Sequence, residues 1–356
     1  MHDFPEKRES ETIKMKQICL EENRLQEILL KIRKVRLCVV GDVCMDIYWY
    51  ADMKKSRLSR ETPHYPLPIV REISSPGACG NVINNMSALP VGKITPVSVF
   101  GKDWRGYLLL KWFREHGISM EGLIESSRFV TPAYGKPMRM GISDVVYEDP
   151  RLDFENREPV SGEDEEKVLN ALTKAASESD VIVVSDQFSF GIITEKVRKK
   201  LAELAEKMPV IVDSREKAPL YRGMILKPNE IEAAQCLGKE ALPESASDAD
   251  YEKLADELAK RNGQPVIITL GKRGAVWSDG RESVLAPAFR NRHPIDIVGA
   301  GDTFLSAFSA AYAAGISGKE CTFFASLASA VTVRKIGTTG TATAEEILDC
   351  YRESCL

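Results

Sequence analysis

The chain has 356 residues, of which 44% are hydrophobic and 28% charged, as in an ordinary globular enzyme. Lys and Arg number 48 against 52 Asp and Glu, and the resulting net charge of −4 provides no general attraction for nucleic acid. No apolar run reaches the length of a membrane span, and the N-terminus lacks the apolar core of a secretion signal. We therefore expect a cytoplasmic protein that binds neither nucleic acid nor membranes.

The N-terminal part, residues 1–34, is predicted to be a polar segment followed by an amphipathic helix. The apolar residues with helical spacing are Leu25, Ile28, Leu29 and Ile32. The rest of the chain, residues 35–356, is of a length that one large α/β domain can fill.

Continuous apolar runs in this domain are typical of strands buried on both faces of a parallel sheet. The runs cover residues 35–41, 180–186, 209–213, 224–227 and 265–271. Helical patterns lie between them, so the sequence predicts an α/β fold with a doubly wound, mostly parallel sheet flanked by helices. Ligands of such folds bind beyond the carboxyl ends of the strands.

Two regions interrupt this alternation of strands and helices. Residues 46–73 are rich in Tyr, Trp, Arg and Pro, and residues 128–155 alternate like short antiparallel strands. We predict that the two regions together form a small β-sheet lid over the active site.

The segment Gly299-Ala300-Gly301-Asp302 places two glycines before an acid where a helix is predicted to begin. The free N–H groups of a helix start attract an anion, and glycines allow a phosphate to approach the backbone closely. Asp302 would then take a proton from a hydroxyl that attacks this phosphate. The alternative is a glycine turn that enters a packed helix, with Asp302 as a capping acid.

Two common nucleotide motifs are excluded. The glycines at 299 and 301 are not followed by a strand and an acid about 20 residues later, as a dinucleotide fingerprint requires. The chain also has no G-x-x-x-x-G-K-[ST] motif, which excludes a P-loop kinase.

Several motifs match, in order and spacing, those of the ribokinase-like (phosphofructokinase-B type) sugar kinases, which the chain resembles from about residue 35 to about residue 349. The segment DIVGAGDTF at 296–304 is similar to the strongest signature of that family. The resemblance implies that ATP is the phosphoryl donor, that Asp302 is the catalytic base, and that Gly299, Ala300 and Gly301 form the anion hole.

The resemblance also implies which residues bind the nucleotide and the metal ion. Asn229 and Glu232 match the N-x-x-E motif, in which Glu232 would help to hold Mg²⁺, partly through water. The alternative is a capping box, in which Asn229 caps a helix and the acid three residues later caps it in return. Thr269, Gly271 and Gly274 resemble the nucleotide loop, although a G-x-x-G alone is only a turn signal.

A monovalent cation such as K⁺ belongs to the same resemblance. Asp296 and residues 334–338 lie where family members often bind such an ion through carbonyl groups.

On the substrate side, the resemblance places Gly77 and Asn81 against the sugar, with Ala78 in place of the second glycine of a Gly-Gly pair. Asp42 and Asp46 follow the first strand and can accept hydrogen bonds from sugar hydroxyls. For Asp46 the alternative is a turn acid at the end of a strand.

Basic residues of the lid suggest a phosphorylated substrate. Arg139 and Arg151 would meet a distal phosphate, and Asp153 would accept from a hydroxyl beside them. The alternative for both arginines is a solvated surface.

Five segments resemble a subgroup, the bacterial heptose 7-phosphate kinases: residues 41–50, 57–63, 151–155, 221–223 and 335–339. The chain departs from this subgroup at Arg60, which replaces a proline, and at Gln187 to Phe190, where a lysine is lost.

The sequence therefore predicts an ATP-dependent kinase that converts heptose 7-phosphate to the 1,7-bisphosphate and forms a homodimer through its lid. Two alternatives remain open. One is a kinase of another sugar or of a nucleoside, such as ribose or fructose phosphate. The other is a catalytically silent sugar-binding regulator of the same fold.

Overall fold

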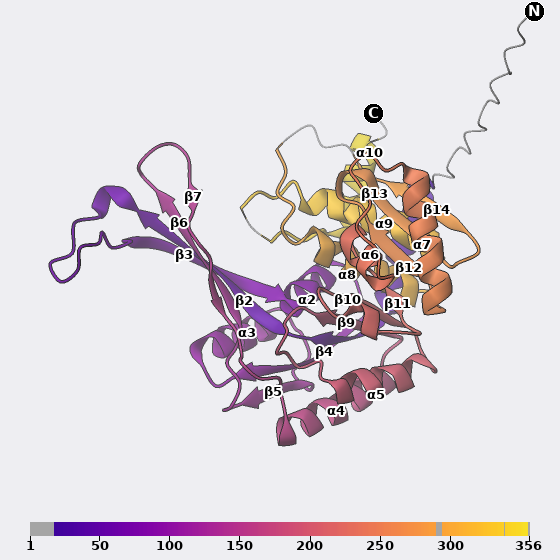
Figure 1. The fold of residues 1–356 in the computed structure, drawn as a ribbon, viewed down its shortest axis with the longest axis horizontal. Helices are drawn as coiled ribbons and strands as arrows, with labels where there is room; N and C mark the ends of the chain where they lie inside the picture. Colours follow the sequence, from indigo (N-terminus) through magenta and orange to yellow (C-terminus); the bar gives the residue numbers. More distant parts are fainter. Residues whose placement is uncertain (1–17, 290–293, 338, 355–356) are drawn as a thin grey trace, which may run out of the picture.

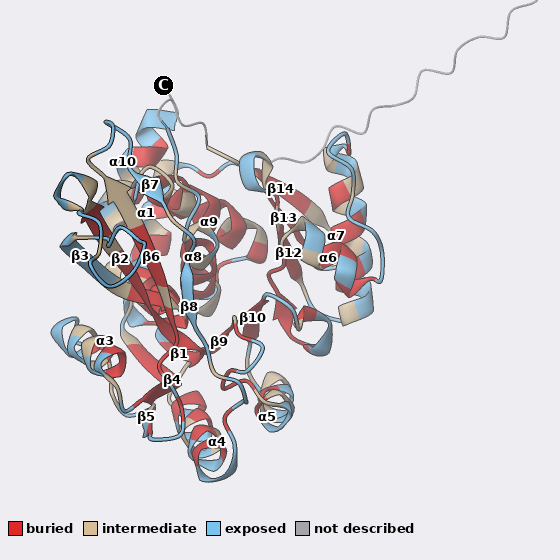
Figure 2. Cartoon of the chain, turned by 60° about the vertical axis from the view of Figure 1, so that its left-hand side comes forward, coloured by how far each residue is buried: buried red, intermediate tan, exposed pale blue. Residues whose placement is uncertain are grey.

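A computed structural model describes residues 18–289, 294–337 and 339–354. Figure 1 shows a large layered body and a narrow, twisted sheet that projects from it. Buried residues are concentrated in the central strands and on the inner sides of the helices (Figure 2). Within the described ranges, no helix has the length and apolar character needed to cross a membrane.

The body is built on a nine-stranded sheet in the order β14-β13-β12-β11-β10-β9-β1-β4-β5. All pairs from β5 to β12 are parallel, and β13 and β14 join antiparallel at one edge. The strands are β1 (Arg36–Gly41), β4 (Lys93–Gly101), β5 (Leu123–Ser126), β9 (Val181–Asp186), β10 (Val210–Ser214), β11 (Ile225–Leu226), β12 (Val266–Thr269), β13 (Gly274–Ser278) and β14 (Ser283–Pro287). The five predicted strands are present, each within two residues of the predicted ends.

Successive side chains of β1 enter different cores, as expected for a strand buried on both faces. Leu37 and Val39 belong to one hydrophobic core, and Cys38 and Val40 belong to the other. The first core is covered by α1 (Glu22–Lys31), α2 (Cys79–Ala88), α3 (Trp104–Glu115), α8 (Ala300–Ala313), α9 (Gly318–Thr332) and α10 (Ala344–Ser354). The second is covered by α4 (Gly162–Ser177), α5 (Glu195–Ala205), α6 (Glu230–Cys236) and α7 (Asp248–Asn262). The predicted doubly wound α/β fold is confirmed.

The predicted N-terminal helix is α1, which buries Leu25, Ile28 and Leu29. It docks on the C-terminal helix α10, where Arg352 forms an ion pair of 2.7 Å with Glu22. The predicted polar segment before it lies almost entirely outside the described residues.

The projecting sheet is the lid predicted from residues 46–73 and 128–155. Its strands are β2 (Val43–Asp52), β3 (Ile69–Ala78), β6 (Ala133–Met140), β7 (Tyr147–Glu148) and β8 (Leu152–Phe154). Their order is β3-β2-β6-β7, with β8 also paired to β6. Strands β2 and β6 are parallel because the chain passes through the body between them. The lid strands reach further toward the body than predicted, so that Gly77 and Ala78 lie at the root of the lid.

Candidate active site

The predicted anion hole lies at the start of α8, which begins at Ala300 as expected. Gly299 caps this helix with a φ of 81°, a left-handed conformation that favours glycine. The first turn of α8 presents backbone N–H groups that have no partner within the helix, together with the positive end of the helix dipole. This geometry suits an anion such as a phosphate.

Asp302 lies in the first turn of α8 and is half-buried. Burial raises the pKa of its carboxyl to about 7, although a hydrogen bond from Asn81 acts in the opposite direction. The Asn81 Nδ2 donates to Asp302 Oδ2 at 2.6 Å. A carboxylate with a pKa near neutrality can accept a proton efficiently at physiological pH.

A buried network fixes the orientation of Asn81. Asn85 Nδ2 donates to Asn81 Oδ1 at 3.2 Å, and Thr303 Oγ1 donates to Asn85 Oδ1 at 2.6 Å. Because the oxygen of the Asn81 amide is occupied by Asn85, its nitrogen faces Asp302. The network ties α2 to α8 and so holds the carboxylate in place.

Lys227 brings a positive charge to the anion hole, a role that the sequence reasoning did not assign. Its side chain is only 6% exposed, and its Nζ lies 2.9 Å from Asp213 Oδ2. A Cβ placed on Gly301 would lie 3.9 Å from the same Nζ, which puts the ammonium beside the helix start. Burial acts to lower the pKa of Lys227, but Asp213, with smaller contributions from Glu232 and Asp302, raises the pKa on balance, so the ammonium stays charged. Its position directly after strand β11 was the available signal.

Asn229 and Glu232 form the capping box that the sequence analysis kept as an alternative. Asn229 caps α6, and its N–H donates to Glu232 Oε2 at 2.8 Å. This geometry occupies one carboxylate oxygen and leaves Oε1 for a metal-bound water. Burial raises the pKa of Glu232, and Asp213 acts in the same direction. Among the described residues no group of three His, Cys, Asp or Glu forms a preformed metal cluster.

A single acid such as Glu232 would fit Mg²⁺ better than a metal held entirely by protein, because Mg²⁺ in kinases keeps water and substrate phosphates as ligands.

The predicted nucleotide loop lies beside the Asn229 motif. The Thr269 N–H donates to the Pro228 carbonyl at 3.0 Å, and Asn229 and Thr269 form an isolated β-bridge. Gly271 has a φ of 53° and borders open space. Gly274 has a structural reason of its own, because an added Cβ would lie 2.0 Å from the Ala286 carbonyl oxygen.

Asp296, predicted near a monovalent cation, joins two loops through backbone groups. Its Oδ1 accepts from Val298 N at 3.0 Å, and its Oδ2 accepts from Gly337 N at 3.0 Å. Within the predicted segment 334–338, Thr338 lies outside the described residues.

Asp42 is engaged by backbone and is only 2% exposed. It accepts hydrogen bonds from Ile192 N at 2.6 Å and from Phe188 N at 3.4 Å. A Cβ on Gly191 would lie 2.2 Å from its carboxylate oxygens. Burial, reinforced by Asp186, raises the pKa of Asp42 to about 7. In this structure Asp42 positions the loop after β9.

Asp46 lies at the root of the lid, on β2, and is 5% exposed. Lys136 Nζ lies 3.5 Å from Asp46 Oδ1 and donates to the Tyr48 hydroxyl at 2.9 Å. A Cβ on Gly77 would come within 2.7 Å of Asp46 Oδ2, so glycine is needed there. Lys136 was not predicted, because its partner lies on a strand 90 residues away.

The two predicted lid arginines lie in different places. Arg151 forms an ion pair with Asp153 at 2.6 Å and stacks over the Tyr134 ring, 4.1 Å from its centre. Tyr134 is the register partner of Asp46, so Arg151 and Asp153 lie near the root of the lid. Arg139 lies five residues beyond Tyr134 on β6, roughly 16 Å from it at 3.3 Å per residue. Arg139 pairs with Asp149. The structure thus places Arg151 near the root of the lid and Arg139 toward its tip.

Two substrate loops differ from the family pattern, at Ala78 and at Gln187 to Phe190, and the structure shows the local effect of each difference. Ala78 has a φ of 49°, a left-handed conformation in which an alanine is strained. The loop that lacks a lysine is held by another one, since Lys217 Nζ donates to the Phe188 carbonyl at 2.9 Å and to Asp186 Oδ1 at 3.2 Å.

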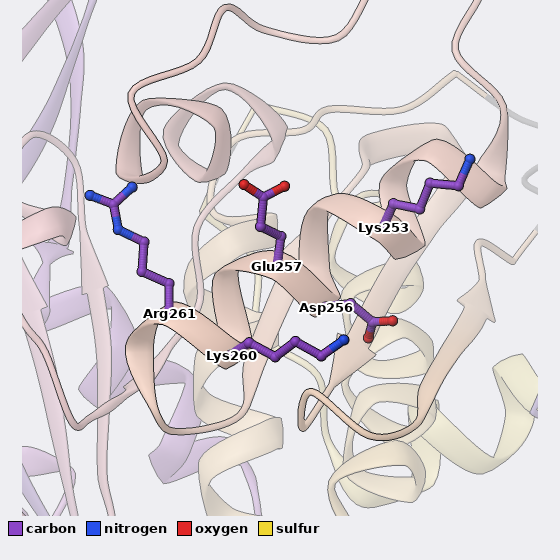
Figure 3. Close-up of a pocket in the computed structure, with 5 residues that line it drawn as sticks. All are labelled: Lys253, Asp256, Glu257, Lys260 and Arg261. Atoms are coloured by element: carbon purple, nitrogen blue, oxygen red, sulfur yellow. The ribbon is translucent and has the colours of Figure 1, made fainter.

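A separate hollow lies on the outer surface of α7, as Figure 3 shows. It is lined by Lys253, Asp256, Glu257, Lys260 and Arg261. Its carboxylates already have partners, because Glu257 pairs with Lys239 and Asp256 accepts from Ser278. Ser278 is the register partner of Val266, the first residue of β12, so the hollow lies at the amino end of this parallel strand. Ligands of such sheets bind at the carboxyl ends, so the start of α8 remains the candidate active site.

The chain is similar to several known proteins. The pfkB family carbohydrate kinase profile matches residues 146–345. The chain is 32% identical over 321 residues to "Bifunctional protein HldE" of Nitratiruptor sp., covering 90% of this chain and 65% of that protein. The chain thus spans about 65% of the length of that curated relative.

Two solved structures have the same fold. Phosphofructokinase-2 from Escherichia coli has a TM-score of 0.70 at 18% identity, covering 90% of this chain and 100% of that one. Ribokinase from Arabidopsis thaliana has a TM-score of 0.66 at 19% identity, covering 89% and 98%. The chain belongs to the pfkB family of carbohydrate kinases, which are phosphotransferases with an alcohol group as acceptor.

Proposed function

We propose that the protein transfers the γ-phosphoryl group of ATP to a hydroxyl of a phosphosugar, with heptose 7-phosphate as the first candidate. The observation that carries the kinase chemistry is the half-buried Asp302, whose pKa is raised to about 7 beside the start of α8. The sequence motifs shared with heptose 7-phosphate kinases and the relative named HldE support the choice of sugar.

In this proposal the oxygen of the acceptor hydroxyl attacks the γ-phosphorus of ATP, and Asp302 takes the proton of that hydroxyl. The N–H groups of Gly299, Ala300 and Gly301 would bind the oxygens of the transferred group, for which the Ala300 N–H must leave the Ile297 carbonyl to which it donates at 3.2 Å. The Lys227 ammonium would offset the growing charge of these oxygens. Glu232 would help to hold Mg²⁺ through water, and the bound metal would supply positive charge that neutralises the leaving diphosphate.

The nucleotide would lie along the joined loops of Asn229 and Thr269, with Gly271 open toward it. The loops joined by Asp296 would hold K⁺ through their carbonyl groups. ATP, Mg²⁺ and K⁺ are thus assigned to one side of Asp302, and the sugar is assigned to the side of the lid.

Arg151 supports a phosphorylated acceptor, because it is a guanidinium near the root of the lid and within electrostatic range of Asp46. Replacing Arg151 by Ala should raise the Michaelis constant for the phosphosugar about 10- to 150-fold, the effect of losing one charged hydrogen-bond pair. The Michaelis constant for ATP should stay nearly unchanged. Release of ADP, measured over a panel of free and phosphorylated sugars and nucleosides, tests both statements.

If an unphosphorylated sugar is turned over efficiently and Arg151→Ala does not change that turnover, the phosphosugar proposal is wrong. Efficient phosphorylation of fructose phosphate or ribose, with no turnover of heptose 7-phosphate, would replace the substrate and leave the kinase chemistry in place.

We also propose that two copies pair through their lids. Strand β3 is an edge strand of the lid, and its residues Ile69, Val70 and Ile73 are exposed. An exposed apolar edge strand is suited to pairing with another copy. Light scattering of the wild type and of Ile73→Asp tests this, since a wild-type monomer would contradict the proposal.

A further inference from the structure

Arg215 lies where the lid approaches the body, at a point that the sequence motifs do not mark. It directly follows β10, and its N–H donates to the carbonyl of Asp186, the last residue of β9, at 3.2 Å. The loop that follows Asp186 carries Phe188, whose N–H is held by Asp42 and whose carbonyl is held by Lys217. Arg215 therefore projects from a firmly anchored strand end.

The Tyr134 ring connects this strand end with the lid. Phe188 stacks on Tyr134 with ring centres 5.7 Å apart, and Arg151 lies 4.1 Å from the centre of the same ring. Arg215 is in electrostatic range of Tyr134 and contributes, with Arg151, to lowering the pKa of its hydroxyl against the larger effect of burial. The guanidinium of Arg151 thus contacts the Tyr134 ring from the lid, while Arg215 on the body is within electrostatic range of the same residue.

The two arginines differ in what already binds them. Arg151 is paired with Asp153. Arg215 is exposed, and within the part of the chain that the structure describes its guanidinium makes no hydrogen bond or ion pair. An exposed guanidinium with all its N–H donors free is suited to bidentate recognition of a phosphate.

We propose that Arg215 and Arg151 together bind the phosphate already present on the acceptor, so that this phosphate bridges the body and the lid. This inference rests on the proposed function, because it requires a phosphorylated acceptor. The inference adds Arg215 of the body to Arg151 of the lid as a ligand of the phosphate. The phosphate then also helps to close the lid. A substrate that carries it draws the lid toward the body and helps to exclude water from Asp302.

The test is steady-state kinetics of Arg215→Ala, Arg151→Ala and the double variant, with phosphorylated and free forms of the same sugar. Each single change should raise the Michaelis constant for the phosphorylated form about 10- to 150-fold. The double variant should lose less than the product of the two effects, because both groups bind one phosphate. For the free sugar the constants should stay within a few-fold of the wild type.

Two further variants control for charge and for surface substitution. Arg215→Lys keeps the charge but not the bidentate geometry and should restore part of the affinity. Arg114→Ala removes an exposed arginine in the last turn of α3 and should change neither Michaelis constant.

The outcomes separate this inference from the proposed function. If the wild type does not use phosphorylated sugars, the proposed function fails and this inference fails with it. If the wild type uses them and Arg215→Ala leaves their Michaelis constant unchanged, only this inference fails. Arg215 is also in electrostatic range of Glu232, so a raised Michaelis constant for ATP alone would assign Arg215 to the nucleotide and overturn the bridge.

Discussion

Replacing Asp302 by Asn removes the proposed base with little change of shape. The new amide oxygen can still accept the hydrogen bond that Asn81 donates at 2.6 Å to Asp302 Oδ2. The variant should therefore fold and bind nucleotide, while its turnover number falls roughly 100-fold or more, the usual contribution of a general base. A 100-fold loss corresponds to about 2.7 kcal/mol of activation free energy.

The pKa of Asp302 gives the pH dependence of the wild type. With the pKa raised to about 7, the carboxylate is fully available above neutrality. At pH 6 the carboxyl of Asp302 is ionised in about one molecule in ten. The turnover number at pH 6 should therefore be roughly a tenth of its constant value at high pH. The variant should lack this acidic limb.

Stability should change in the opposite sense. A carboxyl whose pKa is raised on folding stabilises the protein below its unfolded pKa, near 3.8, and this contribution is lost as the pH rises to about 7. Asp302→Asn removes this loss, so the stability of the variant relative to the wild type should rise with pH, by at most about 4 kcal/mol once the pH is above 7. Coupled ADP release and thermal unfolding at several pH values measure both effects.

Asp279→Asn, an exposed turn acid, is the matched control. Turnover of Asp302→Asn within a few-fold of the wild type, with the acidic limb unchanged, would refute the assignment of the base.

Two other substitutions test the metal side and the strained turn. Glu232→Gln should raise the Mg²⁺ concentration needed for half-maximal activity at nearly constant sugar affinity, because the amide loses the charge that favours metal-bound water; an unchanged Mg²⁺ dependence would leave Asn229 and Glu232 as a helix cap only. Ala78→Gly should increase the free energy of unfolding by about 1 kcal/mol, since glycine adopts a φ of 49° without strain; denaturant unfolding measures this, and a loss of stability would contradict the strain.

Local patterns were sufficient to predict the fold and the start of the site. Apolar runs and helical spacing depend only on neighbouring residues, and they predicted five strands of the parallel sheet and α1 to within a few residues. Strands β4 and β5 of the same sheet were not predicted. The glycines before Asp302 set the backbone of the helix start by their own conformational freedom, so the sequence predicted that α8 begins near Ala300.

The tertiary structure decided which charges meet. Lys227 binds Asp213, and Lys136 binds Asp46, across strands whose partners and register no local pattern states. The same register places Arg151 at the root of the lid and Arg139 toward its tip, although both belong to one predicted segment. Which side chains pair depends on how distant strands align in space. The periodicity of the sequence indicates only which face of its own strand or helix a residue occupies.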